Sequence, residues 1–74
     1  SHGRVDVILF GMGRYGSAIA KALMAQQIQI LAIEQNPNEI TYWQSRGVNI
    51  IYGNTCDHEF IASLPLQGVQ WVIC

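Results

Sequence analysis

The chain has 74 residues and a formal net charge of −1; half of its residues are hydrophobic and 12% are charged. This composition excludes a disordered chain and is typical of a single small α/β domain. The four Lys and Arg residues are scattered. Proteins that bind nucleic acid gather such cations on one face, so we expect no nucleic-acid partner. No apolar run approaches the roughly 20 residues that span a bilayer, so we do not expect this segment to insert into a membrane.

The first half of the chain contains two predicted strands and a helix. Val5 to Phe10 is a nearly continuous apolar run, typical of a strand covered on both faces. A helix follows, and its apolar positions at helical spacing are expected to face the core: Tyr15, Ala18, Ile19, Ala22 and Leu23. Ile28 to Glu34 is predicted to be the second strand.

A second helix has recognisable signals at both ends. Asn36 suits the N-cap, Pro37 the first helical position, and Glu39 the carboxylate position of a capping box. Ile40 and Trp43 form its apolar side, and Gly47 is predicted to end it.

The last third of the chain predicts a strand, a short helix and another strand. Val48 to Tyr52 and Val69 to Cys74 are the two strands. Either Thr55 or Asp57 opens the helix between them, Pro65 stops it, and its apolar residues are Phe60, Ile61 and Leu64.

The predicted order is therefore β-α-β-α-β-α-β. Strands that alternate with helices imply a parallel sheet with right-handed crossovers. We predict an α/β fold, a truncated doubly wound sheet of the Rossmann kind with strand order 3-2-1-4. Residues 1–3 read as a scar of tag cleavage, and the chain ends within a strand, so residues 4–74 are expected to be the N-terminal part of a longer Rossmann-type domain.

The two cysteines, Cys56 and Cys74, lie among aliphatic residues and lack the spacing of a metal site. We expect no metal and predict two buried, reduced thiols, which suit the cytosol.

A glycine motif is the strongest functional signal. The sequence Gly11-Met12-Gly13-Arg14-Tyr15-Gly16 matches G-x-G-x-x-G directly after the first strand and at the start of the first helix. In such loops the first glycine allows a tight turn, the second leaves room for a pyrophosphate, and the third permits close packing of the helix. The free N–H groups of the first helical turn favour an anion. The alternative is a structural turn without a ligand.

Glu34 is the second candidate, at the end of the second strand and eighteen positions after Gly16. A carboxylate there accepts hydrogen bonds from ribose hydroxyls and repels a 2′-phosphate, and the neighbouring Gln35 and Asn36 supply no cation. The site is therefore expected to prefer NAD(H) or an adenine mononucleotide (AMP, ADP or ATP) over NADP. The alternative is that Glu34 ends a strand in solvent.

Other residues near this edge are weaker candidates. Arg14 suits a phosphate partner or is a solvated surface cation. Tyr15 is placed beside the ligand, although its helical spacing favours core packing. Asn54 and Thr55 follow the third strand and are expected near the adenine, whereas Asp57 is an equal candidate for a helix cap. We find no catalytic constellation, so we expect a binding domain and no enzyme.

Three segments carry a family resemblance: VILFGMGRYGSAIAKAL from Val7, LAIEQNP from Leu31 and IIYGNTCD from Ile51. They resemble the TrkA-N or RCK (regulator of potassium conductance) domains, most of all the cytosolic domain of bacterial monovalent cation:proton antiporters of the potassium efflux type. The resemblance implies binding of NAD(H) or adenine nucleotides, a homodimer, and control of an attached inner-membrane transporter. Asn54 and Cys56 depart from the Asp and small residue usual there.

Two further expectations remain open at the level of the sequence. The cofactor-binding fragment of an NAD-dependent oxidoreductase is the alternative function, because Rossmann halves serve both roles. The last strand, with Trp71 on it, is expected to be an exposed apolar edge that pairs with a second copy of the chain.

Overall fold

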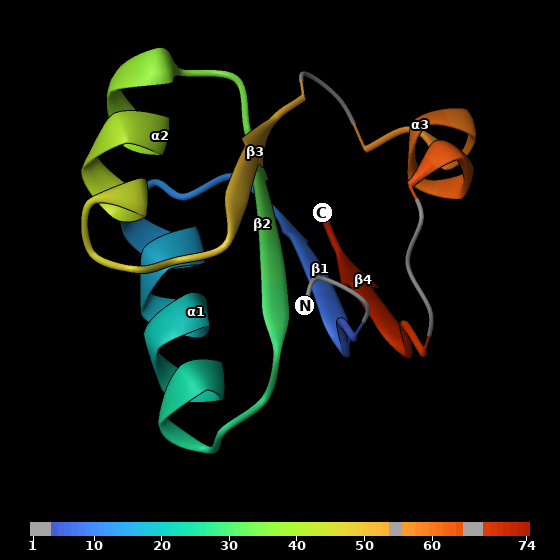
Figure 1. Ribbon diagram of the computed structural model, residues 1–74, viewed down its shortest axis with the longest axis horizontal. Helices are drawn as coiled ribbons and strands as arrows, with labels where there is room; N and C mark the ends of the chain where they lie inside the picture. The colour runs from blue at the N-terminus through green and yellow to red at the C-terminus, as the bar shows by residue number, and fades with distance from the viewer. Residues whose placement is uncertain (1–3, 54–55, 65–67) are drawn as a thin grey trace.

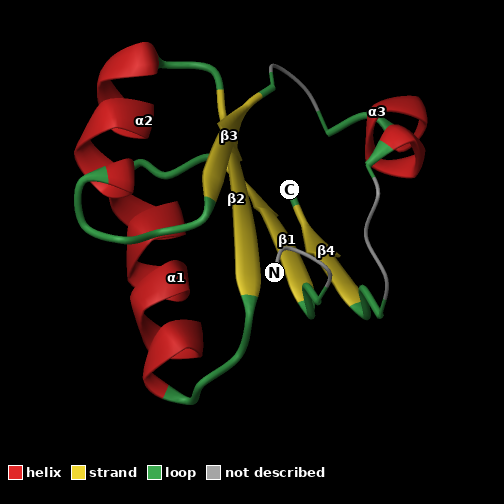
Figure 2. Cartoon of the chain, viewed as in Figure 1, coloured by secondary structure: helices red, strands yellow, loops and turns green. Residues whose placement is uncertain are grey.

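The computed structural model describes residues 4–53, 56–64 and 68–74. The elements follow in the predicted order: β1 (Val7–Phe10), α1 (Arg14–Ala25), β2 (Ile30–Glu34), α2 (Pro37–Gln44), β3 (Ile50–Tyr52), α3 (His58–Ser63) and β4 (Trp71–Ile73). The four strands form one parallel sheet in the order β3-β2-β1-β4 (Figures 1 and 2). The predicted Rossmann-like α/β fold and its strand order are therefore confirmed.

The helices lie on both faces of the sheet, with α1 and α2 on one face and α3 on the other (Figure 1). Right-handed crossovers produce this arrangement, because the chain moves one way across the sheet from β1 to β3 and returns from β3 to β4. All four strands are parallel, so their carboxyl ends, and the loops that follow them, meet at one edge.

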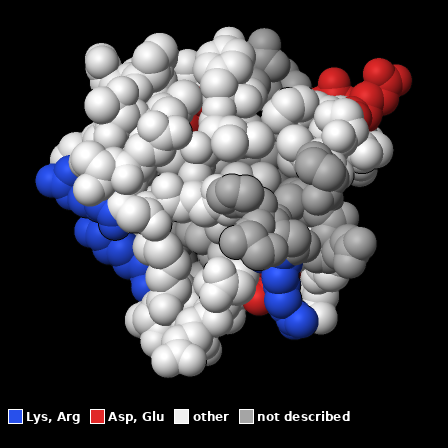
Figure 3. Space-filling model, viewed as in Figure 1, with Lys and Arg blue, Asp and Glu red and all other residues white. Residues whose placement is uncertain are grey.

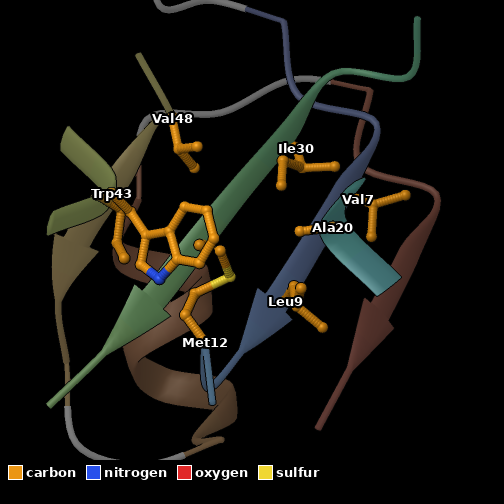
Figure 4. Close-up of a cluster of buried hydrophobic side chains, with 9 residues drawn as sticks. Val7, Leu9, Met12, Ala20, Ile30, Trp43 and Val48 are labelled. Atoms are coloured by element: carbon orange, nitrogen blue, oxygen red, sulfur yellow. The ribbon is translucent and has the colours of Figure 1, made fainter. Parts of the chain in front are cut away.

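Side chains of successive strand residues point to opposite faces and build two apolar clusters. The cluster beneath α1 and α2 (Figure 4) consists of Val7, Leu9, Met12, Ala20, Ile30, Ala32, Trp43, Val48 and Ile50. The cluster beneath α3 consists of Val5, Ile8, Leu31 and Ile33, with partly buried residues packed against it that include Phe60, Ile61 and Leu64. The sheet is thus covered on both faces near β1 and β2, as its continuous apolar runs predict.

The predicted core face of α1 is wrong for four of its five residues, and only Leu23 packs against the core as predicted. Tyr15 is 80% exposed and Ile19 is 38% exposed, and Ala18 and Ala22 are also exposed. The buried residue is Ala20, with Leu23 and Met24 partly buried around it. Gly16 fixes this rotation because it approaches the carbonyl of Gly11 closely, and positions four and seven residues later lie on the same side of a helix.

The N-terminus of α2 is capped as predicted, but it has no capping box. The Asn36 side chain accepts a hydrogen bond from the Asn38 amide at 2.9 Å, and Pro37 occupies the first helical position. The Glu39 carboxylate instead accepts from Nε1 of Trp43 at 3.0 Å. Trp43 is buried, and a buried indole N–H needs an acceptor, so this bond uses the carboxylate one turn away.

The ends of α1 and α2 also explain why β2 and β3 are two residues shorter than predicted. Gly47, with a φ of +82°, donates to Gln44, and Val48 donates to Trp43, which is the Schellman pattern. Gln27, with a φ of +63°, takes the place of the glycine at the end of α1, and Ile28 donates to Leu23. The amides of Ile28 and Val48 thus close helices and do not join the sheet.

The crossover to β4 contains α3, and Asp57 is its N-cap. The Asp57 carboxylate accepts from the Glu59 amide at 2.8 Å. Of the two openings considered for this helix, Asp57 is therefore the one used, whereas Thr55 and Pro65 lie outside the described residues.

The prediction of two buried, reduced thiols is wrong. Cys56 and Cys74 form a disulfide, and both residues are exposed. Cys56 precedes α3 and Cys74 directly follows β4, so both lie at the carboxyl edge of the sheet, beyond its apolar clusters. Their Cα atoms are 5.9 Å apart, within the usual range for a disulfide. The crossover through α3 brings them together, and sequence spacing gives no sign of it.

Three observations concern possible binding partners: the edge strand, the distribution of cations and the character of the helices. In the order of strands β4 is an edge, and its Trp71 is 67% exposed. In the view of Figure 3, Lys and Arg atoms lie apart, over the side of α1 and α2 and at the lower edge. Among the described residues, no helix combines the length and apolar character needed to span a bilayer.

Candidate functional site

The glycine loop leads from the end of β1 to the start of α1. Gly11 has a φ of +91°, a conformation that side chains disfavour, and its amide donates to the carbonyl of Ile33 at 2.8 Å. A Cβ on Gly16 would lie 1.9 Å from the Gly11 carbonyl oxygen, so only glycine permits this approach of the helix to the loop. A Cβ on Gly13 would meet nothing within 4 Å. The loop is therefore tight at its ends and open in its middle.

The N-terminus of α1 faces this open part of the loop. The N-cap is Gly13, which has no side chain with which to cap the helix, and the first turn contains no acidic residue. The first intrahelical bond is donated by Ser17 to Gly13 at 2.9 Å, so the amides of residues 14–16 have no partner within the helix. These amides and the helix dipole favour an anion at this position.

Glu34 fastens the glycine loop to the end of β2. Its carboxylate accepts from the Met12 amide at 2.8 Å through Oε1. Through Oε2 it accepts from the amides of Gln35 at 3.0 Å and Asn36 at 2.8 Å. A carboxylate offers about four acceptor positions, so these three bonds leave about one for a ligand. Glu34 therefore does not simply end a strand in solvent.

A pocket of about 220 Å³ opens at the carboxyl edge of the sheet, beside this carboxylate. It is lined by Phe10, Gly11, Ile33, Glu34, Gln35, Gly53 and Cys56. Apolar side chains form part of its wall, and Glu34 supplies a charged group next to them. In open α/β sheets, this edge is where ligands bind.

The structure brings together only some of the candidate residues. Gly11, Glu34 and Gln35 line the pocket, whereas Gly13, Arg14 and Tyr15 lie exposed around the start of α1. Asn54 and Thr55 lie outside the described residues.

The side chains of Met12 and Tyr15 point in opposite ways, into the core and into solvent. The Met12 side chain is 1% exposed and lies beside the ring of Trp43 in the core (Figure 4), so only its backbone faces the loop. Tyr15 does not pack in the core.

Sequence reasoning did not select four residues that line the pocket: Phe10, Ile33, Gly53 and Cys56. Each lies at or just after the carboxyl end of β1, β2 or β3, and that position was the available signal.

The parallel sheet, the glycine loop and the carboxylate at the end of β2 define a Rossmann-like domain with the loop of dinucleotide-binding proteins. Residues 7–74 match the family model of the TrkA-N domain, and the chain belongs to that family. The family expected from the glycine loop and the segments after β1, β2 and β3 is thus confirmed.

A relative among curated proteins agrees with this assignment. The chain is 30% identical over 66 residues to the Escherichia coli (strain K12) protein named "Putative cation/proton antiporter YbaL". The match covers 89% of the chain but only 12% of that protein, so the chain corresponds to a small part of it. No solved structure matches the chain.

Proposed function

We propose that the chain is a regulatory domain that binds NAD(H) or an adenine mononucleotide in the cytosol and controls a monovalent cation transporter in the same protein. The membership in the TrkA-N family and the likeness to a protein named as a cation/proton antiporter support the link to transport. The observation that most supports nucleotide binding is the pocket beside Glu34, next to the open glycine loop.

The chemistry of the site matches the parts of a nucleotide. Phosphate oxygens accept hydrogen bonds from the free amides of the first turn of α1, with Arg14 next to them as a cation. The remaining acceptor position of Glu34 takes a ribose hydroxyl. The adenine occupies the pocket that Phe10 and Ile33 help to line, with Asn54 and Thr55 proposed near it.

Glu34 also accounts for a preference for NAD(H) over NADP. A 2′-phosphate would lie next to its carboxylate, and the side chains of Gln35 and Asn36 carry no charge to offset the repulsion. The nucleotide binds one arrangement of the domain and transporter more tightly than the other, and its binding therefore favours that arrangement. In this proposal the domain performs no reaction.

Calorimetric titration of the chain with AMP, ADP, ATP, NAD, NADH and NADPH tests the proposal. The sharpest variant is Gly13→Ala, because the added Cβ meets no protein atom and fills only the space where phosphates approach. Gly13 is the N-cap, so we expect this variant to lose only about 0.5 kcal/mol of stability. We expect it to weaken binding at least tenfold.

Glu34→Gln probes the ribose side of the site, with Glu59→Gln as its matched control. The control removes the same charge from an exposed position at the start of α3. We expect weaker binding of AMP and NAD in Glu34→Gln and unchanged binding in the control. Binding of NADPH as tight as that of NADH, or equal affinities in the parent and Gly13→Ala, would contradict the proposed site.

A further inference from the structure

The disulfide of Cys56 with Cys74 lies next to the pocket and has no part in the function proposed above. Cys56 is one of the residues that line the pocket, whereas Cys74 follows the last strand and does not line it. The bond therefore ties one wall of the pocket to the carboxyl end of β4, across the end of the sheet.

Few buried contacts hold this wall of the pocket, so the disulfide is important for the position of the wall. The helix that follows Cys56, α3, contains no fully buried residue. It is held against the sheet by the partly buried side chains of Phe60, Ile61 and Leu64. A segment held by few buried contacts opens at low cost, so cleavage of the disulfide leaves the wall at Cys56 free to move.

Both cysteines are also accessible to chemistry from solvent. They are exposed, and access is one of the factors that set the rate of thiol–disulfide exchange. Disulfides of mesophilic cytosolic proteins are usually transient, with catalytic or redox-sensing roles. An exposed disulfide in the wall of a ligand pocket fits the second of these roles.

We propose that Cys56 and Cys74 form a reversible redox switch that sets the affinity of the pocket for adenine nucleotides; this inference rests on the function proposed above. With the bond formed, the wall at Cys56 is tied to the end of β4 and cannot adjust to a bound base. The oxidised chain is therefore the low-affinity form. Reduction releases the wall at Cys56, which then adjusts to the bound base.

The chemistry is exchange with a low-molecular-weight thiol. Two thiol molecules reduce the bond in two steps. The first thiolate attacks one cysteine sulfur, which gives a mixed disulfide and releases the other cysteine; the second thiolate then attacks the sulfur of the bound small thiol and releases the remaining cysteine. The products are two protein thiols and one low-molecular-weight disulfide. The reverse reaction, with that disulfide as oxidant, restores the Cys56–Cys74 bond.

The test compares AMP and NAD binding to the chain reduced with dithiothreitol and to the chain oxidised with hydroxyethyl disulfide. Mass spectrometry verifies the two states, because the oxidised chain is lighter by two hydrogens. We expect a Kd about tenfold larger for the oxidised chain, within the range of typical coupling between sites. The double variant Cys56→Ser/Cys74→Ser can form neither the bond nor an adduct with the oxidant, so it is expected to bind with the reduced-state Kd under both conditions.

Three results would overturn the switch, and two of them leave the proposed function intact. Equal Kd values for the two states show that the bond is structural only. Two free thiols after oxidation show that the bond does not form. Absence of binding in both states and in the double variant refutes nucleotide binding itself, and the switch with it. Cys56→Ser is a second variant, and circular dichroism verifies that both variants are folded.

Discussion

Replacement of Gly16 by Ala has two opposing effects on the free energy of unfolding: the added Cβ clashes with the glycine loop, and Ala has the better helix propensity. The added Cβ would lie 1.9 Å from the Gly11 carbonyl oxygen and 2.9 Å from its carbonyl carbon. A carbon and an oxygen in contact lie about 3.3 Å apart, so helix and loop must separate by about 1.4 Å. Ala20, which is fully buried, resists movement of the helix, and the bond from the Gly11 amide to Ile33 resists movement of the loop.

The magnitudes decide which effect is larger. Overpacking of this kind costs about 3 kcal/mol, the upper part of its usual range. The better helix propensity of Ala returns up to about 1 kcal/mol. We therefore expect Gly16→Ala to lower the free energy of unfolding by about 2 kcal/mol, and the Tm by about 8–16 °C for a domain of this size.

Urea unfolding followed by circular dichroism measures this change, with Gly13→Ala as the control. Gly13 lies three residues earlier, and a Cβ there meets nothing within 4 Å. The control is expected to lose only about 0.5 kcal/mol, as an N-cap substitution. If Gly16→Ala is as stable as the parent chain, propensity outweighs the clash, and the close approach of helix and loop is not a constraint in solution.

Three other predictions concern the helix ends and the sheet edge. Gln27→Gly is expected to raise the free energy of unfolding by about 0.5–1 kcal/mol, because Gln27 has a φ of +63°; a gain of equal size in Gln26→Gly, whose φ is −96°, would contradict this reason. Glu39→Ala removes the acceptor of the buried Trp43 Nε1 and is expected to cost about 1–2 kcal/mol in urea unfolding, whereas Glu39→Gln keeps an acceptor oxygen and loses less. We propose a homodimer through the β4 edge, so sedimentation at increasing concentration should detect association that Trp71→Lys abolishes; a parent chain that stays monomeric at high concentration refutes the pairing.

Local patterns in the sequence predicted most of the fold. The apolar runs, the cap at Asn36 and the stop at Gly47 gave the element order. The doubly wound pattern of Rossmann folds then supplied the strand order, 3-2-1-4, without any knowledge of contacts. The glycine motif and Glu34 were assigned to the same edge of the sheet because parallel strands bring their carboxyl ends together. These signals act over a few residues, which is why they can be seen in the sequence.

The features that the sequence did not reveal depend on contacts between distant segments. The rotation of α1 is fixed by the contact of Gly16 with Gly11, because the helix has apolar residues on more than one side. The pairing of Cys56 with Cys74 depends on the whole crossover from β3 to β4. The three backbone amides bound by Glu34 come from two different loops, of which one begins 23 residues earlier at Gly11. The sequence by itself thus determined which elements form and in what order they lie, whereas only the tertiary structure decided which side chains meet, because those meetings follow from packing.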